Sequence, residues 1–350
     1  MNQTKDPETL YYEVRETISR LDFDRIWPGF QPLKFALYDN ERCFFDGRWV
    51  KKTDAFCANT SIRYEGGQIA IWMVQEALDI SVLSSKIVHE MFHGYQTLKG
   101  WDCWPNELEA LYRYEYDAEN LALKLRENEL LLALLDRPDA AALEEILALR
   151  KYRSLKFPYE FSYESKVEEI EGTANYVEWQ VLKQLDEGRA DKLTEEMRAM
   201  MTKAEHLFPI RIPSYFTGAL LINALCSAGR YRFAAAARPV ILSLLKDVTP
   251  SGGDFPGKAD TLRRTADAVA AFRRESEAII RAALDRGEVV LRGPAELVGV
   301  NVYNARCCGG FITSTYFLMY REGQENRMLQ GDFVIGMKDE KTIDTVYRMA

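Results

Sequence analysis

The spacing of apolar residues changes near residue 80 of this 350-residue chain, and that change limits the folds open to it. Before residue 80, short runs alternate apolar and polar residues, and the dipeptides Asp46-Gly47 and Gly66-Gly67 separate them. These dipeptides suit two-residue hairpin loops because they tolerate positive φ. We therefore expect a small, mostly antiparallel sheet over about Leu33–Val74.

Helical spacing of apolar residues replaces the strand pattern from Ser81 onward. In the first helix, Ser81 or Ser84 is the expected N-cap and Gly100 the expected stop. The helices predicted after it are about 106–136, about 139–155, the segment YESKVEEIEGTANYVEWQVLKQL, Lys192–Glu205, Ser214–Ser227 and Tyr231–Lys246.

A connector rich in glycine and proline, DVTPSGGDFPGKAD, ends the helical part. One further helix, Thr261–Leu284, is expected to lead into strands within EVVLR, LVGVNVY, FITSTYFLMY and MLQGDFVIGM. The predicted fold is α+β. Its parts are an N-terminal sheet-bearing part at 1–78, a helical body at 79–246, a linker with a connecting helix at 247–285, and a β-rich C-terminal domain at 286–350.

Composition and charge narrow the classes of protein to which the chain can belong. Hydrophobic residues make up 47% and charged residues 28%, which is ordinary for a globular protein. The formal net charge of −8 argues against a nucleic-acid-binding surface. A secretory signal is not expected, and no apolar run approaches the roughly 20 residues that cross a bilayer. Six scattered cysteines indicate reduced thiols, so we expect a cytoplasmic protein. From the apolar runs and the net charge, we expect it to bind neither membrane nor nucleic acid.

Two of the three histidines lie in the stretch VHEMFHGYQ, Val88–Gln96. Residues four apart share one face of a helix, so His89 and His93 can bind the same metal ion. Glu90 then lies beside that ion, where a carboxylate can hold a water molecule and take its proton. Zinc lowers the pKa of a bound water from 15.7 toward roughly 7, which makes a hydroxide-like nucleophile available at neutral pH. The pattern H-E-x-x-H is therefore typical of zinc hydrolases. The alternative is a pair of solvated histidines on a polar helix.

A zinc site of this kind needs a third protein ligand. The residues after the second histidine exclude a third histidine six residues further on. The continuation H-E-x-x-H-x-x-G-x-x-H fails because Gln96 and Lys99 stand where glycine and histidine are required. The third ligand is therefore expected to be acidic. The candidates are Glu115 in YEYDAE and Glu168 and Glu171 in EEIEGTANYVEW.

Glu171 begins a motif that continues with Gly172, Ala174, Tyr176 and Glu178. This motif resembles the segment E-G-x-A-x-Y-x-E that carries the glutamate ligand in aminopeptidase N-like gluzincins, a group of zinc metallopeptidases. The resemblance implies that Glu171 is the third ligand, whereas Glu115 lies at the shorter helix-to-helix distance familiar from thermolysin-like gluzincins. The presence of Gly172 also has a physical explanation. A glycine inside a helix costs roughly 1 kcal/mol against alanine, but the missing Cβ lets the helix that carries the metal ligand pack closely against a neighbour.

The downstream segment PSYFTGA is similar to the segment S-Y-x-K-G-A of the same aminopeptidases. The similarity implies that Tyr215 hydrogen-bonds the oxyanion of a tetrahedral intermediate, as a preorganised donor does. Gly218 and Ala219 also match, whereas Thr217 replaces the usual lysine. The alternative for Tyr215 is a core tyrosine on an amphipathic helix. The G-A-M-E-N segment that captures a free substrate amine is absent, so exopeptidase specificity is not implied.

The resemblance covers roughly Ile69–Leu225 and implies a metallopeptidase with one zinc ion per chain and a peptide or protein as substrate. In such an enzyme Glu90 is the general base and later gives a proton to the leaving amine. Gluzincins align the substrate backbone antiparallel to an edge strand, and the strand QIAIWM just before the histidine helix is the expected guide. The remaining histidine, His206, has no motif around it and is expected to be a surface or core residue.

Two alternatives from other classes remain open at the level of sequence. The first is a non-catalytic interaction protein that keeps a zincin fold with a structural or vestigial metal site. Glu90 argues against it, because a structural zinc site has four protein ligands and no use for a base. The second is a metal-free helical scaffold that contains the motif by chance.

Overall fold

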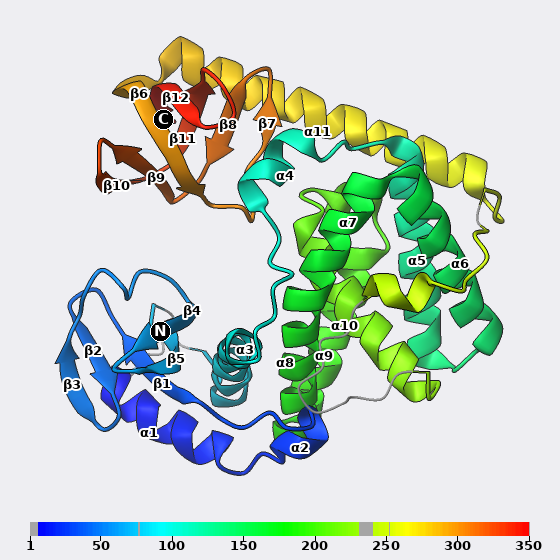
Figure 1. The fold of residues 1–350 in the computed structure, drawn as a ribbon, viewed down its shortest axis with the longest axis horizontal. Coiled ribbons are helices and arrows are strands. Elements are labelled where there is room, and N and C mark those ends of the chain that lie inside the picture. Colours follow the sequence, from blue (N-terminus) through cyan, green and yellow to red (C-terminus); the bar gives the residue numbers. More distant parts are fainter. Residues whose placement is uncertain (1–5, 76–77, 231–240, 252, 350) are drawn as a thin grey trace.

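Two β-sheets lie on the same side of a large helical body in the computed structural model of the protein (Figure 1). The structure describes residues 6–75, 78–230, 241–251 and 253–349. The predicted α+β class is confirmed, with a small N-terminal mixed sheet, helices in the middle and an antiparallel sheet at the C-terminal end. The long helix α11, Lys258–Arg286, runs from the helical body to the C-terminal sheet (Figure 1).

The N-terminal sheet has the strand order β3-β2-β1-β5-β4. Its strands are β1 Lys34–Tyr38, β2 Arg42–Phe45, β3 Arg48–Lys51, β4 Thr60–Tyr64 and β5 Gly67–Met73. Asp46 and Gly47 have φ angles of 50° and 79° and form the turn between β2 and β3, as predicted. The turn between β4 and β5 is Glu65-Gly66, with φ angles of 45° and 82°, one residue earlier than predicted. Glycine occupies the second position of both turns, which requires positive φ.

Strand β5, which contains QIAIWM, lies inside this sheet. It pairs in parallel with β1 and antiparallel with β4. The prediction that it is an edge strand is therefore wrong. The hairpin at Glu65-Gly66 folds β4 back onto β5, so β4 becomes the edge of the sheet instead.

Helix α3, Ile80–Leu98, is the helix predicted to carry the two histidines. Its N-cap is Asp79, whose carboxylate accepts a hydrogen bond from the backbone N–H of Ser81. The predicted caps Ser81 and Ser84 are therefore wrong, because the aspartate before them already satisfies the free N–H groups of the first turn. Gly100 follows the helix with a φ of 69°, as expected for a stop. Helix α1, Pro7–Ile18, packs against α3.

The helical body follows the predicted order, but one predicted helix is broken, and the helix predicted over YESKVEEIEGTANYVEWQVLKQL contains a π-helical turn. The helix predicted at 106–136 is two helices, because the chain leaves helical geometry at Tyr114 and Asp117 caps the next helix. Residues 231–240 of the predicted helix Tyr231–Lys246 lie outside the described residues. The remaining elements are α2 Phe23–Ile26, α4 Glu107–Arg113, α5 Ala118–Asp136, α6 Ala140–Lys156, α7 Pro158–Val167, the π-helical turn η1 Glu168–Gly172, α8 Thr173–Leu185, α9 Glu187–Met201, η2 Ala204–Leu207, α10 Arg211–Ser227 and η3 Ile241–Leu245.

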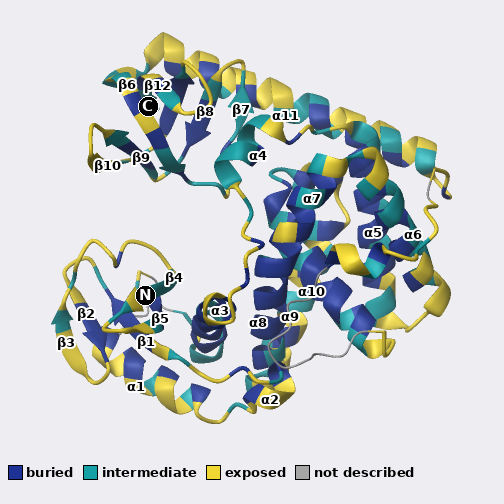
Figure 2. Ribbon diagram, viewed as in Figure 1, coloured by how far each residue is buried: buried dark blue, intermediate teal, exposed yellow. Residues whose placement is uncertain are grey.

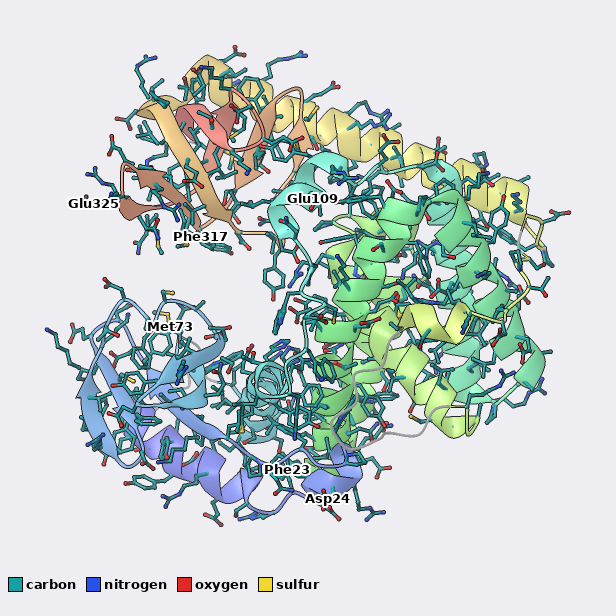
Figure 3. All side chains as sticks on the ribbon, viewed as in Figure 1. Phe23, Asp24, Met73, Glu109, Phe317 and Glu325 are labelled. Atoms are coloured by element: carbon teal, nitrogen blue, oxygen red, sulfur yellow. The ribbon has the colours of Figure 1, made fainter. Side chains whose placement is uncertain are left out.

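The C-terminal sheet has the strand order β10-β9-β6-β12-β11-β8-β7. Its strands are β6 Glu288–Val300, β7 Cys307–Cys308, β8 Phe311–Ser314, β9 Phe317–Glu322, β10 Glu325–Gln330, β11 Phe333–Met337 and β12 Thr342–Arg348. Strand β12 was not predicted. The sheet has its own apolar core, which includes Ile312, Phe333 and Ile343. In the view of Figure 3, Met73 of β5 and Phe317 of β9 lie on the facing sides of the two sheets.

The helices differ in how much of their surface is buried. Helices α3, α7 and α8 are largely buried, whereas α11 exposes much of its surface (Figure 2). The main core joins the N-terminal helices to α3 through Trp27, Phe30 and Phe92. Within the described ranges, no helix is both long and apolar enough to cross a bilayer.

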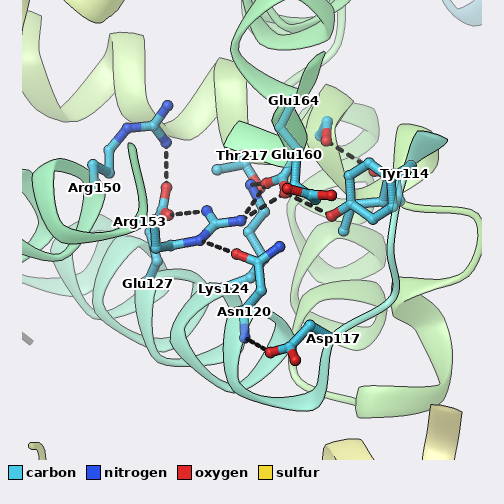
Figure 4. Close-up of polar contacts among 12 residues, drawn as sticks. Tyr114, Asp117, Asn120, Lys124, Glu127, Arg150, Arg153, Glu160, Glu164 and Thr217 are labelled. Atoms are coloured by element: carbon cyan, nitrogen blue, oxygen red, sulfur yellow. Dashed lines mark hydrogen bonds and ion pairs between the residues drawn. The ribbon is translucent and has the colours of Figure 1, made fainter. Parts of the chain in front are cut away.

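A buried cluster of charged side chains joins α5, α6, α7 and η1 (Figure 4). Its members are Lys124, Glu127, Arg150, Arg153, Glu164 and Glu168, each at most 1% exposed. Arg153 Nη2 donates to both carboxylate oxygens of Glu164 at 2.6 and 2.8 Å. Lys124 Nζ lies 2.8 Å from Glu168 Oε1, and Arg150 pairs with both Glu127 and Glu168. Each buried charge therefore has a partner of opposite sign, which burial requires.

Candidate metal centre

Helix α3 presents His89 and His93 on the face that packs against α8. Their Nε2 atoms are 3.1 Å apart, and the side chains are 10% and 11% exposed. Two ring nitrogens this close together either share one proton or point at one cation.

The other ring nitrogen of each histidine faces an oxygen. His93 Nδ1 lies 2.8 Å from Gln96 Oε1, and His89 Nδ1 lies 3.2 Å from Glu178 Oε2. The amide nitrogen of Gln96 donates to the carbonyl oxygen of Ile170 at 2.8 Å, so its oxygen is left to accept from the ring. A proton on Nδ1 leaves the Nε2 lone pair free, which is the arrangement found around histidines that bind metals.

Glu171 completes the group. Its Oε2 atom lies 3.2 Å from His93 Nε2 and 3.7 Å from His89 Nε2. Burial acts to raise the pKa of Glu171, but His93, His89 and Arg211 together hold the pKa well below its usual value. An ionised carboxylate is the form in which glutamate binds a metal.

The π-helical turn η1 decides which glutamate reaches the histidines. A π-turn inserts one residue into a helix and rotates the side chains that follow it. Glu168, at the start of η1, enters the buried charge cluster, while Glu171, near its end, faces α3.

A contact between two glycines brings η1 against α10. A Cβ atom on Gly172 would lie 2.6 Å from the Cα atom of Gly218, and one on Gly218 would lie 2.8 Å from the carbonyl oxygen of Glu168. Neither position has room for a side chain. The close approach expected from Gly172 is therefore confirmed, and its partner is the glycine of the PSYFTGA segment.

The other acidic candidates and the third histidine lie elsewhere. Glu168 is paired with Lys124 and Arg150. Glu115 is exposed in the break between α4 and α5. His206 is half-buried in η2, with Nδ1 3.2 Å from the carbonyl oxygen of Ala199.

The three atoms fit a tetrahedral cation. A zinc ion with bonds of about 2.0–2.1 Å separates its ligand atoms by about 3.3 Å. The observed separations are 3.1, 3.2 and 3.7 Å. No other group of three or more metal-ligand side chains converges in this way within the described part of the chain.

Glu90 lies on the same helix and lines the same pocket. Burial raises the pKa of its carboxyl group, and the neighbouring His93 and His89 act in the opposite direction. A carboxyl group with a raised pKa accepts and returns a proton more readily near neutral pH than an ordinary glutamate does.

Arg211, at the start of α10, holds the second oxygen of Glu171. Its Nη2 atom lies 2.7 Å from Glu171 Oε1 and 3.0 Å from the hydroxyl of Tyr215, and Nη1 pairs with Glu107. The hydroxyl of Tyr215 lies 3.2 Å from that of Tyr303, which belongs to the loop between β6 and β7. With Oε1 held by Arg211, the Oε2 atom of Glu171 is left for the histidines.

A pocket of about 300 Å³ opens at this centre. Its lining residues are Asn59, Thr60, Ser61, His89, Glu90, His93, Thr97, Trp104, Glu171, Arg211 and Tyr303. The N-terminal sheet, the helical body and the C-terminal sheet region therefore all contribute to its wall. A larger cavity of about 820 Å³ lies beside α11 and shares Arg211, but it includes none of the three clustered ligands.

Sequence patterns did not point to Arg211, Trp104 or Tyr303. Arg211 stands one helical turn before Tyr215, and this spacing was the one available signal. Trp104, whose ring centre lies 6.0 Å from that of His93, and Tyr303 belong to loops without a recurring pattern.

No family model, curated protein or solved structure matches this chain.

Proposed function

We propose that the protein is a zinc metallopeptidase of the gluzincin type. The observation that carries the proposal is the convergence of His89, His93 and Glu171 beside Glu90 in an open pocket. Three protein ligands and access from outside are typical of a catalytic zinc site, whereas structural sites have four protein ligands.

Each residue of the centre has a role in this proposal. His89, His93 and Glu171 would bind zinc, which when bound supplies an acidified water molecule. Glu90 would take a proton and later give it to the leaving amine. Tyr215, through its hydrogen bond with Tyr303, belongs to a phenol pair placed to stabilise negative charge on the substrate oxygen.

A peptide suits the edge of the N-terminal sheet. Asn59, Thr60 and Ser61 line the pocket at the start of β4, whose outer side pairs with no strand among the described residues. The backbone of an extended peptide can add to such an edge through main-chain hydrogen bonds. The guide strand in the proposal is therefore β4 rather than β5.

The six cysteines are all free thiols, which supports the further proposal of a cytoplasmic location. The alternative function is a non-catalytic protein with a vestigial centre. The half-buried Glu90 carboxyl group beside the ligands favours catalysis over this alternative.

The variant Glu90→Gln tests the proposal. Glu90 is not one of the three clustered ligands, so the variant should keep about one zinc per chain while hydrolysis falls by about 10²–10⁴ or more. Zinc content is measured by elemental analysis, and hydrolysis is measured on a peptide found by digesting a broad peptide library. Equal cleavage by the variant and the parent protein would assign the activity to a contaminant or another site and favour the non-catalytic alternative.

A further inference from the structure

Two phenols lie at the metal centre, and only one of them lines its pocket. Tyr303 is a lining residue together with His89, His93 and Glu171, whereas Tyr215 is not. Burial raises the pKa of Tyr303, and the charges of Glu171 and Glu90 act in the same direction.

The direction of the first hydrogen bond follows from Arg211. A guanidinium can only donate, so Arg211 Nη2 donates to the Tyr215 hydroxyl at 3.0 Å. The hydroxyls of Tyr215 and Tyr303 lie 3.2 Å apart, and either of them can donate to the other. In the arrangement in which Tyr215 donates, the proton of Tyr303 is free to point into the pocket.

Arg211 opposes part of the effect of the two carboxylates on Tyr303. Arg211 is cationic and nine-tenths buried, and it acts to lower the pKa of Tyr303, which burial, Glu171 and Glu90 raise. Successive hydrogen bonds that run in one direction also polarise one another. The last hydroxyl in the series from Arg211 through Tyr215 is that of Tyr303.

The loop that carries Tyr303 is held at both ends. The side-chain oxygen of Asn301 accepts from the backbone N–H of Tyr303 at 3.2 Å, and its amide nitrogen donates to Thr315 Oγ1 at 3.1 Å. Asn304 also bonds Thr315, at 2.6 Å. Asn301 and Asn304, on either side of Tyr303 in the same loop, thus tie that loop to Thr315 in the connection between β8 and β9, which fixes the backbone around Tyr303 as a site residue on a loop requires.

We infer that Tyr303, supplied by the C-terminal β-rich region, is the catalytic phenol that contacts the substrate oxyanion, and that Tyr215 and Arg211 position it. The inference rests on the proposed peptidase function and refines it, because it moves the contact with substrate from Tyr215 to Tyr303. It also assigns a role to the C-terminal region, which completes the pocket.

The test compares Tyr303→Phe, Tyr215→Phe and the double variant in the full chain loaded with zinc. Tyr303→Phe should lower kcat by about 10²–10³, as loss of one oxyanion donor does, with KM changed less than about threefold. Tyr215→Phe should lower kcat by roughly tenfold, because it removes only the support. The double variant should match Tyr303→Phe alone, since a residue that acts through Tyr303 has no effect in its absence.

A second readout does not depend on turnover. A phosphinate pseudopeptide imitates the tetrahedral intermediate, so its affinity should fall in parallel with kcat/KM across the three variants, while zinc affinity stays unchanged. The fluorescence of Trp104, which lines the pocket, can report the binding. Tyr316→Phe is the matched control, since Tyr316 is 74% exposed in the same region of the chain, and it should behave as the parent protein does.

The outcomes separate this inference from the function on which it rests. If the parent protein cleaves peptide and Tyr303→Phe keeps its kcat, the inference is overturned and the peptidase function stands. Equal losses in both single variants that multiply in the double variant would also overturn it, because Tyr215 would then contact the substrate independently. If the parent protein neither cleaves peptide nor binds the phosphinate, the proposed function fails and the inference fails with it.

Discussion

At the scale of single residues, the centre depends on the two oxygens of Glu171 being used differently. Oε2 faces His93 Nε2 at 3.2 Å, and Oε1 accepts from Arg211 at 2.7 Å. A carboxylate held in this way is oriented before any metal binds, which reduces the entropy lost on binding.

The choice of third ligand gives a prediction. Glu171→Gln should remove or greatly weaken zinc binding, because an amide oxygen is a neutral and poorer ligand than a carboxylate. Zinc affinity is measured by competition with a chelator of known strength. Glu115→Gln, at an exposed position away from the centre, is the matched control and should bind zinc as the parent protein does. Retained zinc in the first variant and lost zinc in the second would transfer the ligand role to Glu115.

At the scale of elements, the decisive contact is the crossing of η1 and α10. Gly172 and Gly218 meet backbone to backbone, so the two elements approach without side chains between them. The crossing brings Arg211 and Tyr215 of α10 to the same side of the centre as Glu171 of η1. The loss of helix propensity at Gly172, about 1 kcal/mol, is thus linked to the geometry of the ligand set.

This contact predicts the effect of a methyl group. Gly172→Ala should destabilise the protein by about 1–3 kcal/mol, because its Cβ would lie 2.6 Å from a backbone atom that cannot move away freely. Zinc affinity should fall as well, since η1 must shift. The free energy of unfolding is measured by urea unfolding, and zinc affinity is measured by competition with a chelator. Gly188→Ala in α9 is the control, because its nearest neighbour would be a side-chain oxygen at 3.4 Å. Equal stability of the two variants would contradict the close crossing.

At the scale of the whole molecule, the buried charge cluster makes stability depend on pH. Burial acts to raise the pKa of Glu164, but Arg153 and Lys124 outweigh it and lower the pKa to about 2. The folded-state pKa lies below the ordinary value of 4.5, so the stabilisation is present above 4.5 and is lost as the pH falls toward 2.

The free energy of unfolding should therefore fall by roughly 3 kcal/mol on this account between pH 4.5 and 2. Glu164→Gln should be less stable near neutral pH and should show a weaker dependence across that window. Measurements with a chelator present exclude effects of metal release. Glu16→Gln, which removes an ion pair whose side chains are 66% and 70% exposed, should leave the profile unchanged. An identical slope in Glu164→Gln and the parent protein would contradict the assignment.

The sequence by itself determined the features that depend on local spacing. Apolar periodicity was enough to divide strands from helices, and the H-E-x-x-H pattern was enough to put His89 and His93 on one face of α3. Gly172 was recognisable because a glycine inside a helix needs a reason. These features follow from the geometry of neighbouring residues, which is the same in any fold.

Only the tertiary structure decided which distant residues meet. The π-turn turned Glu171 toward the histidines and sent Glu168 into the charge cluster, and the hairpin at Glu65-Gly66 made β4 the edge in place of β5. Tyr303 reached the pocket through the packing of a separate sheet. Such contacts join elements that are remote in sequence, and they are set by which buried faces fit together rather than by the spacing of residues along the chain.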